Sequence, residues 1–181
     1  KSGDVDLIKN YSQKTKEFDY FEVSEIRKSK SEISSSIIRD LLETGKIIEA
    51  NKMLGRNWSI NSRVILGKQN GRKIGFKTVN LNIDSYCNLS YGVYLVKIEI
   101  FKLSKKKFFG IANYGVKPTV ENKSPLLEVH IFDFDHEIYN YRVKVEFLNF
   151  IRSEKKFVSL EKLRDQIIKD IKQAKNDRLF L

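Results

Sequence analysis

The sequence has few of the residues that support a disulfide-stabilised, zinc-dependent or membrane-spanning protein. It contains one cysteine, Cys87, in 181 residues, so no internal disulfide can form, which is typical of a reducing cytoplasm. The two histidines, His130 and His136, have no histidine or cysteine partner at a zinc-ligand spacing. No apolar run approaches the roughly 18 residues that suggest a membrane span. We therefore expect a cytoplasmic protein without a zinc site or a membrane partner.

The charge is strongly basic, with 34 Lys and Arg against 23 Asp and Glu and a formal net charge of +11. A charge of this size suggests binding to nucleic acid. The basic residues are scattered along the chain, however, and a basic face attracts ATP equally well. We expect no nucleic-acid partner, and a basic β-barrel that binds single-stranded nucleic acid is the alternative.

The first part of the sequence is too short for a domain of its own. Residues 1–33 predict one helix and one strand, which cannot bury both faces of a strand. The chain begins with Lys1 and has a single methionine, Met53, which favours a fragment or a processed chain.

Two short helices are predicted next. A run of serines, Ser34–Ser36, precedes an apolar segment that ends before Gly45, the pattern of a hydroxyl N-cap and a glycine stop. A second helix over 47–54 ends at Gly55. Phosphate binding at the first helix N-terminus, with Arg39 one turn in, is the alternative to plain capping.

The segment from residue 67 to residue 80 contains three glycines and a cation, followed by Thr78 and Asn80. Glycines let consecutive N–H groups point at one anion, and Arg72 between them can add a forked charge. Thr78 and Asn80 project to one side of an extended segment, and their oxygens suit Mg²⁺. A hairpin connection that uses its glycines for turn geometry is the alternative, since the Walker spacing is absent. The three glycines are Gly67, Gly71 and Gly75.

From Trp58 the pattern becomes one of alternating apolar and polar residues, which predicts strands. The predicted strands lie near 60–67, 92–102, 107–113, 127–134 and 142–150. Their number and spacing predict a mainly β protein, an antiparallel sheet that closes into a small barrel. A final helix capped by Ser159 carries an apolar stripe for packing on the barrel. The stripe consists of Leu160, Leu163, Ile167, Ile171 and Ala174.

Glu128 interrupts an apolar strand, where a buried carboxylate is costly unless it has a task. We therefore regard it as a candidate general base for taking a proton from an alcohol. A glutamate on the solvent face of an ordinary strand is the alternative.

Four segments resemble riboflavin kinases in order and spacing. Lys77 and Ser153 stand where that family has proline, and Lys77 loses the fixed φ that proline would give the loop. The four segments are Gly71-Arg72-x-Ile74-Gly75-Phe76-x-Thr78-x-Asn80, residues 110–119, residues 127–130 and residues 150–157.

The resemblance implies a six-stranded Greek-key barrel with a C-terminal helix, and transfer of the γ-phosphoryl group of ATP to riboflavin to give FMN and ADP. It implies that Glu128 is the catalytic base and that Thr78 and Asn80 bind Mg²⁺. A surface ion pair with Glu154 or Asp133 is the alternative role for Arg152. The implied ATP-binding residues are Gly67, Gly71, Arg72, Gly75, Thr78 and Asn80, and the implied flavin-binding residues are Asn113, Thr119, Arg152 and Phe157.

A second resemblance concerns the segment before the barrel. Residues 33–39 resemble an Ile-Ser-Ser-Thr-x-x-Arg motif in the nucleotidyltransferase module of bacterial bifunctional riboflavin kinase/FAD synthetases, and residues 2–5 also resemble that module. This implies that 1–56 is a C-terminal remnant of the module and that 57–181 is the kinase domain. The module's His-x-Gly-His motif is absent, so FAD synthesis is expected only from a longer parent chain. An inactive fragment is a further alternative.

Overall fold

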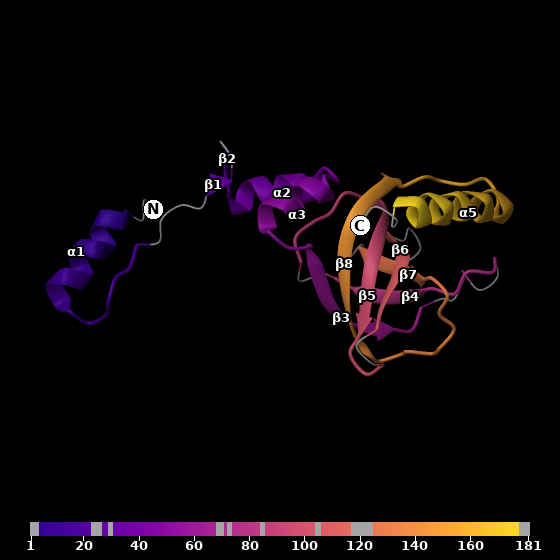
Figure 1. The fold of residues 1–181 in the computed structure, drawn as a ribbon, viewed down its shortest axis with the longest axis horizontal. Coiled ribbons are helices and arrows are strands. Elements are labelled where there is room, and N and C mark those ends of the chain that lie inside the picture. The colour runs from indigo at the N-terminus through magenta and orange to yellow at the C-terminus, as the bar shows by residue number, and fades with distance from the viewer. Residues whose placement is uncertain are drawn as a thin grey trace. The chain divides into compact units, whose positions relative to one another are not determined.

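The computed structural model describes residues 4–22, 27–28, 31–67, 71, 74–83, 86–103, 106–116 and 125–177. The chain forms two compact units, Lys1–Ile33 and Ser34–Leu181 (Figure 1). The second unit contains the barrel and every residue discussed below as part of a site.

The first unit begins with α1, Val5–Thr15, whose N-terminus is capped by the Asp4 carboxylate accepting the N–H of Asp6 at 3.1 Å. Two short strands, β1 (Arg27–Lys28) and β2 (Ser31–Glu32), pair antiparallel. The strand expected near residues 18–23 does not form over 18–22. The described part of this unit therefore offers no partner strand for that segment.

The second unit begins with two short helices, α2 (Ser35–Glu43) and α3 (Ile47–Leu54). Ser34 caps α2, because its hydroxyl accepts the N–H of Ile37 at 3.2 Å, which confirms the predicted cap. Gly45 follows with φ +75°, a conformation that favours glycine.

The helix pair is tied to the barrel through Asn51 of α3. Its side-chain amide donates to the carbonyl of Phe147 at 2.8 Å, and its carbonyl accepts the N–H of Trp58 at 2.7 Å. Leu42, Ile47 and Ala50 are buried in the same core as the strands. The helix pair therefore folds as part of the barrel unit, and the boundary near residue 56 stays a prediction about the origin of this segment.

Six strands form a closed antiparallel barrel, as the sequence predicted, in the order β3-β4-β7-β6-β5-β8. The alternating pattern identified five of these strands and missed β4, which spans only four residues between loops. The six are β3 (Ser59–Ile65), β4 (Val79–Asn82), β5 (Gly92–Ile100), β6 (Lys107–Gly115), β7 (Leu126–Ile131) and β8 (Arg142–Ser153).

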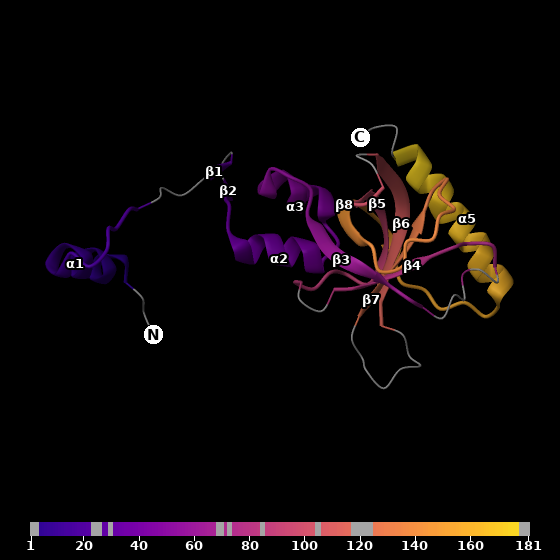
Figure 2. The ribbon, with the colours of Figure 1, turned by 90° about the horizontal axis from the view of Figure 1, so that it is seen from below.

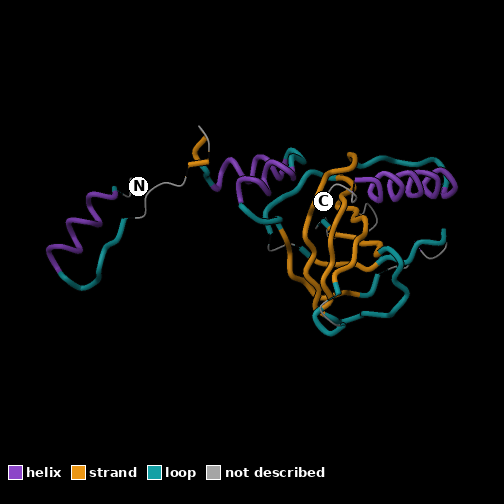
Figure 3. Tube along the Cα trace, viewed as in Figure 1, coloured by secondary structure: helices purple, strands orange, loops and turns teal. Residues whose placement is uncertain are grey.

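The last helix, α5 (Leu160–Asp177), lies against the outer face of the barrel. The Ser159 hydroxyl caps it by accepting the N–H of Lys162 at 3.2 Å. Figure 2 shows α5 along one side of the barrel and α2 with α3 along the other. Figure 3 shows the barrel strands in orange and the helices, α5 among them, in purple. The contact cluster under α5 consists of Val93, Leu95, Phe109, Ile111, Phe132, Leu148, Ile151, Ile167, Ile171 and Ala174.

Candidate active site

One transverse row of residues crosses five strands of the barrel. Asn80 of β4 pairs in register with Glu128 of β7, and Glu128 pairs with Asn113 of β6. Asn113 pairs with Val93 of β5, and Val93 pairs with Arg152 of β8. Residues directly opposite each other on antiparallel strands project to the same face. Four predicted site residues from distant parts of the sequence therefore share one face.

That face is the outside of the barrel. Leu127 and Val129, on either side of Glu128, are buried in the interior core, and side chains alternate between the two faces of a strand. At the other end of the row, Val93 belongs to the cluster beneath α5. The row therefore lies on the outer face of the barrel, with its Val93 end packed near α5.

A cleft of about 380 Å³ opens over this row. The strands form its floor, the last helix forms one wall, and the segments before β4 and after β8 form its rims. Gly71, Thr78, Asn113, Glu128, Arg152 and Phe157, six of the predicted site residues, line it. Its other lining residues are Ile74, Phe76, Val93, Ile111, His130, Glu154, Lys155, Leu160, Leu163, Ile167 and Asp170.

Asn80 is paired with Glu128 across neighbouring strands and is not one of the residues that line the cleft. It is only 4 % exposed, and its side-chain oxygen Oδ1 has no hydrogen-bond partner in the described part of the chain. A buried carbonyl oxygen without a donor is costly, and a cation can satisfy it. The predicted use of Asn80 as an Mg²⁺ ligand therefore fits the structure.

The donor set around Asn80 also fits a hard cation. Thr78, two residues earlier, adds a hydroxyl oxygen on the cleft wall. Within the described ranges, no group of three His, Cys, Asp or Glu side chains could hold a metal. Mg²⁺ usually takes a few protein oxygens and completes its shell with water and substrate phosphate oxygens. The structure accordingly fits a cation that is held jointly with a phosphorylated substrate.

Two of the predicted loop glycines make room for these oxygen donors. A Cβ on Gly67 would lie 1.7 Å from Nδ2 of Asn80, and a Cβ on Gly71 would lie 2.3 Å from the Phe76 carbonyl and 3.3 Å from Oγ1 of Thr78. Gly67 therefore leaves space for the side chain of Asn80, and Gly71 leaves space beside Thr78. The spacing of the glycines in the sequence did not reveal this role. Gly75 has φ +86° and does not line the cleft.

The segment before Thr78 is anchored by contacts through Lys77. The Lys77 carbonyl lies 2.9 Å from Nδ1 of His130, and its Nζ donates to the carbonyl of Asp135 at 2.8 Å and to the Asp135 carboxylate at 3.3 Å. His130 is two residues from Glu128 on the same strand. These contacts fix the backbone at Lys77, the position where a proline in the family would fix φ.

Arg152 makes an ion pair that differs from both pairs considered from the sequence. Its Nη2 donates to Oδ2 of Asp170 at 2.7 Å, and its Nε lies 2.9 and 3.0 Å from the two carboxylate oxygens. Asp133 instead contacts Lys175 at 3.9 Å. The Arg152 guanidinium also lies 5.8 Å from the ring centroid of Phe157. Two of the four predicted flavin-binding residues, Arg152 and Phe157, therefore lie together at one end of the row.

Two predicted site residues, Arg72 and Thr119, lie outside the described residues. Of the remaining nine, the cleft and the row bring together Gly71, Thr78, Asn80, Asn113, Glu128, Arg152 and Phe157.

Within the described residues, no helix is both long and apolar enough to cross a bilayer.

Comparison with known proteins identifies the family. A family model for riboflavin kinase matches residues 54–177. The chain belongs to the riboflavin kinase family. Riboflavin kinases are ATP-dependent enzymes of FMN biosynthesis, so the resemblance seen in the sequence is confirmed.

Curated relatives are longer than this chain. A bifunctional riboflavin kinase/FMN adenylyltransferase from Buchnera aphidicola subsp. Schizaphis graminum is 41% identical over 178 residues, covering 97% of this chain and 56% of the relative. One from Haemophilus influenzae is 43% identical over 143 residues, covering 79% and 46%. The chain thus spans about half the length of these relatives.

A solved structure also matches most of the chain. It is described as a macrolide-efflux protein from Streptococcus pneumoniae, with 34% sequence identity and a TM-score of 0.78 over 95% of this chain and 55% of that one. The efflux activity in that description belongs to the other protein.

Sequence reasoning about this riboflavin kinase domain missed Asp170, which is 2% exposed. Asp170 lies three residues after Ile167, so it falls on the apolar face of the final helix. A carboxylate in an apolar stripe is a detectable signal of a buried pair. His130 was examined only as a metal ligand, and its contact with Lys77 depends on pairing between β4 and β7 that the sequence did not reveal.

Proposed function

We propose that this riboflavin kinase domain transfers the γ-phosphoryl group of ATP to the terminal ribityl hydroxyl of riboflavin, giving FMN and ADP. The observation that carries the proposal is the row running from Asn80 through Glu128 and Asn113 to Arg152 beneath one cleft. The row puts the oxygen donors and the carboxylate at one end and a cation at the other. This arrangement of different groups at the two ends matches a substrate with a reacting alcohol at one end and an aromatic ring at the other.

The length of the row suits riboflavin. Glu128 and Arg152 are three strand spacings apart along the barrel surface, which corresponds to about 14 Å. That length suits an extended ribityl chain together with part of the tricyclic ring. We therefore place the ribityl hydroxyl at Glu128 and the flavin ring near Arg152 and Phe157.

Glu128 is proposed to orient the ribityl hydroxyl and to accept its proton as the bond to phosphorus forms. It lines the cleft on a barrel strand, so the scaffold fixes its direction. Phosphoryl transfer relies mainly on positioning and on neutralising charge, so one well-placed base is sufficient on the acceptor side.

The nucleotide end is proposed to be formed by Thr78, Asn80 and the loop that precedes them. Thr78 and Asn80 would hold Mg²⁺, which when bound neutralises phosphate charge. Gly71 lines the cleft together with Thr78, and its backbone N–H would face the phosphates. The basic charge of the chain would favour ATP binding in general.

Apolar side chains line much of the flavin end, beside the Arg152–Asp170 ion pair. Ile111, Leu163 and Ile167 line the cleft between the barrel and α5, and Asn113 adds an amide group to the floor. A mostly apolar cleft with a few polar groups is typical of a site for an aromatic ligand. These side chains would cover the flavin ring and exclude water from it.

We propose the kinase step alone for this chain. The adenylyltransferase activity belongs to the names of the longer relatives. Both histidines of this chain lie within the kinase domain, on β7 and after it, and the His-x-Gly-His motif is absent. FMN without FAD is therefore the expected product.

The test is chromatography of riboflavin after incubation with the chain, ATP and Mg²⁺. Glu128→Gln should keep the shape of the site and lower turnover by about 10² to 10⁴-fold, the usual worth of a positioned base. Thermal unfolding of both proteins would show that each is folded.

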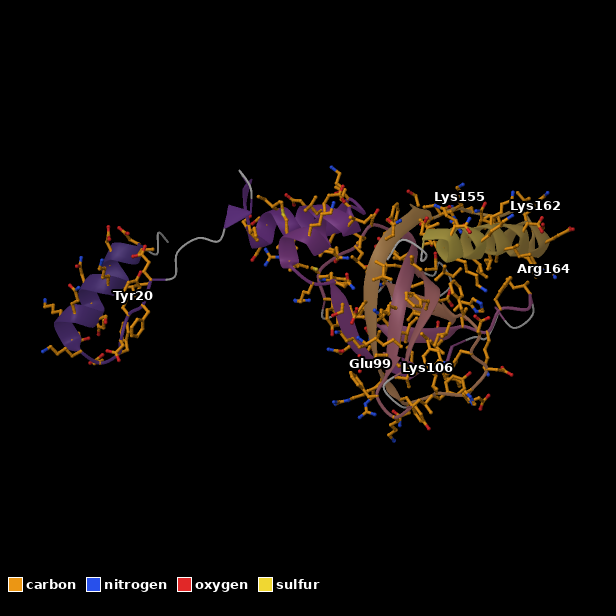
Figure 4. The ribbon with its side chains drawn as sticks, viewed as in Figure 1. Tyr20, Glu99, Lys106, Lys155, Lys162 and Arg164 are labelled. Atoms are coloured by element: carbon orange, nitrogen blue, oxygen red, sulfur yellow. The ribbon has the colours of Figure 1, made fainter. Side chains whose placement is uncertain are left out.

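Glu99→Gln is the matched control. Glu99 is also a strand glutamate, in β5, but it lies at the end of the barrel away from α5, the helix that carries Lys162 and Arg164 (Figure 4). This variant should retain native turnover. A folded native chain that makes no FMN would refute the proposed function, and full activity in Glu128→Gln would remove Glu128 from the mechanism.

A further inference from the structure

The flavin end of the cleft contains a buried ion pair whose acidic member has no assigned role. Asp170 of α5 is 2% exposed, and the Arg152 side chain is 14% exposed. Gln166, one turn earlier on the helix, donates to Oδ1 of Asp170 at 2.8 Å. Together with the contacts from Arg152, these bonds occupy the roughly four acceptor sites of a carboxylate. Asp170 therefore has little remaining capacity to bind a ligand directly.

Arg152, by contrast, retains donors. A guanidinium has five N–H groups. The structure assigns its Nε and one Nη2 hydrogen to Asp170, and one Nη1 hydrogen to the carbonyl of Ser153 at 3.0 Å. Within the described residues, two N–H groups of Arg152 remain without a recorded acceptor, and Arg152 lines the cleft.

We propose that Asp170 is a positioning residue of the flavin site, which acts by fixing the guanidinium of Arg152 so that its two remaining N–H groups face the flavin ring. This inference rests on the proposed function. The acceptors on riboflavin would be the ring carbonyl oxygens, since the ribityl hydroxyl is placed at Glu128.

The forked pair explains why this residue should be an aspartate. A bidentate contact fixes both the position and the plane of the guanidinium, so the ordering is complete before riboflavin binds. A mostly buried guanidinium also needs a compensating charge. Asparagine would supply neither the charge nor the second acceptor, and its NH₂ group would oppose Nη2.

Phe157 supports the same arrangement from the other side of Arg152. Its ring centroid lies 5.8 Å from the guanidinium carbon, within the range of a cation–π contact. Arg152 is therefore held by a carboxylate from α5 and by an aromatic ring from the segment after β8. These two contacts connect the helix to the cleft rim through one side chain.

The experiment measures riboflavin binding by quenching of flavin fluorescence, together with steady-state kinetics, for the native chain and Asp170→Asn. We expect the Kd and KM for riboflavin to rise by about 10-fold or more, which corresponds to a weakened charge-assisted hydrogen bond. The KM for ATP, and kcat at saturating riboflavin, should stay near native values. Lumiflavin, which lacks the ribityl chain, should lose affinity to the same extent.

Asp177→Asn is the matched control. Asp177 is also an aspartate on α5, and it accepts a hydrogen bond from Asn149 of β8 at 3.2 Å, but it does not line the cleft. This variant should bind riboflavin as the native chain does. A purely structural role for Asp170 would lower the unfolding temperature and leave the riboflavin Kd of the folded protein unchanged, and that result would overturn the proposal.

A double-mutant cycle tests whether Asp170 acts through its partner. In an Arg152→Lys background, Asp170→Asn should add little further loss of riboflavin affinity, and an additive loss would contradict the inference.

If Asp170→Asn does not fold, Gln166→Ala is a milder variant that removes one hydrogen bond to Asp170. It should raise the riboflavin Kd by a smaller factor, and an unchanged Kd would also overturn the proposal. A native chain that neither binds riboflavin nor makes FMN would instead refute the proposed function itself.

Discussion

Gly67→Ala would test the buried amide of Asn80 without changing any polar group. The new Cβ would lie 1.7 Å from Nδ2 of Asn80 and 2.6 Å from its Cγ. Carbon atoms normally approach no closer than about 3.5 Å, so the Asn80 side chain would have to retreat by about 2 Å. Asn80 is 4% exposed, so little free space surrounds it.

The expected consequence is a loss of activity larger than the loss of stability. A misplacement of about 1 Å in a catalytic constellation can cost about 10²-fold in rate, so turnover at a fixed Mg²⁺ concentration should fall by roughly that factor. Overpacking costs about 1–3 kcal/mol of the free energy of unfolding. The assay is FMN formation over a series of Mg²⁺ concentrations, and the Mg²⁺ needed for half-maximal rate should rise.

Gly55→Ala separates this effect from general destabilisation. Gly55 has φ +68° and no atom within 4 Å of a built Cβ. An alanine there would be strained by about 1–2 kcal/mol but would contact nothing in the site, so its Mg²⁺ dependence should be native. A Gly67→Ala protein with native turnover and native Mg²⁺ dependence would refute the placement of Asn80 at the metal site.

Two further predictions concern the stability of the barrel unit. Asn51→Ala removes the two hydrogen bonds that this side chain makes to Phe147 and Trp58, so the free energy of unfolding should fall by about 1–3 kcal/mol; denaturant unfolding that shows no change would contradict this role. Burial raises the pKa of Glu146, but hydrogen bonds from Asn57 and Lys144 outweigh it and lower the pKa below its ordinary value of 4.5. Its contribution to stability should be complete above pH 4.5 and lost as the pH falls through the lowered pKa, and Glu146→Gln should reduce that acid dependence.

Much of the fold could be predicted from local patterns. Alternating apolar residues identified five strands, since a strand with one buried face repeats every two residues. Ser34 and Ser159 identified two helix starts, because a hydroxyl at that position satisfies a backbone N–H locally. The four-residue strand β4 was missed because it is too short to show a period. The expected strand after α1 was wrong over residues 18–22, where apolar composition alone does not provide a pairing partner.

The candidate site could be predicted only as a set of residue types with a family pattern. Asn80, Asn113, Glu128 and Arg152 were identified, but their arrangement in one row depends on the register between β4, β7, β6, β5 and β8. Register joins residues that are far apart in the sequence, and no local pattern specifies it. Glu154 and Asp133, the ion-pair partners considered for Arg152 as an alternative, differ from the observed partner Asp170 for the same reason.

The sequence by itself determined that this chain forms a small β-barrel with a C-terminal helix and that it belongs with riboflavin kinases. Those conclusions depend on short-range periodicity and on motifs that are contiguous in the chain. Only the tertiary structure decided that Gly67 makes room for Asn80, that His130 anchors Lys77, and that Asp170 holds Arg152. Each of these contacts is made across strands or between the barrel and α5, so it exists only once the barrel has closed.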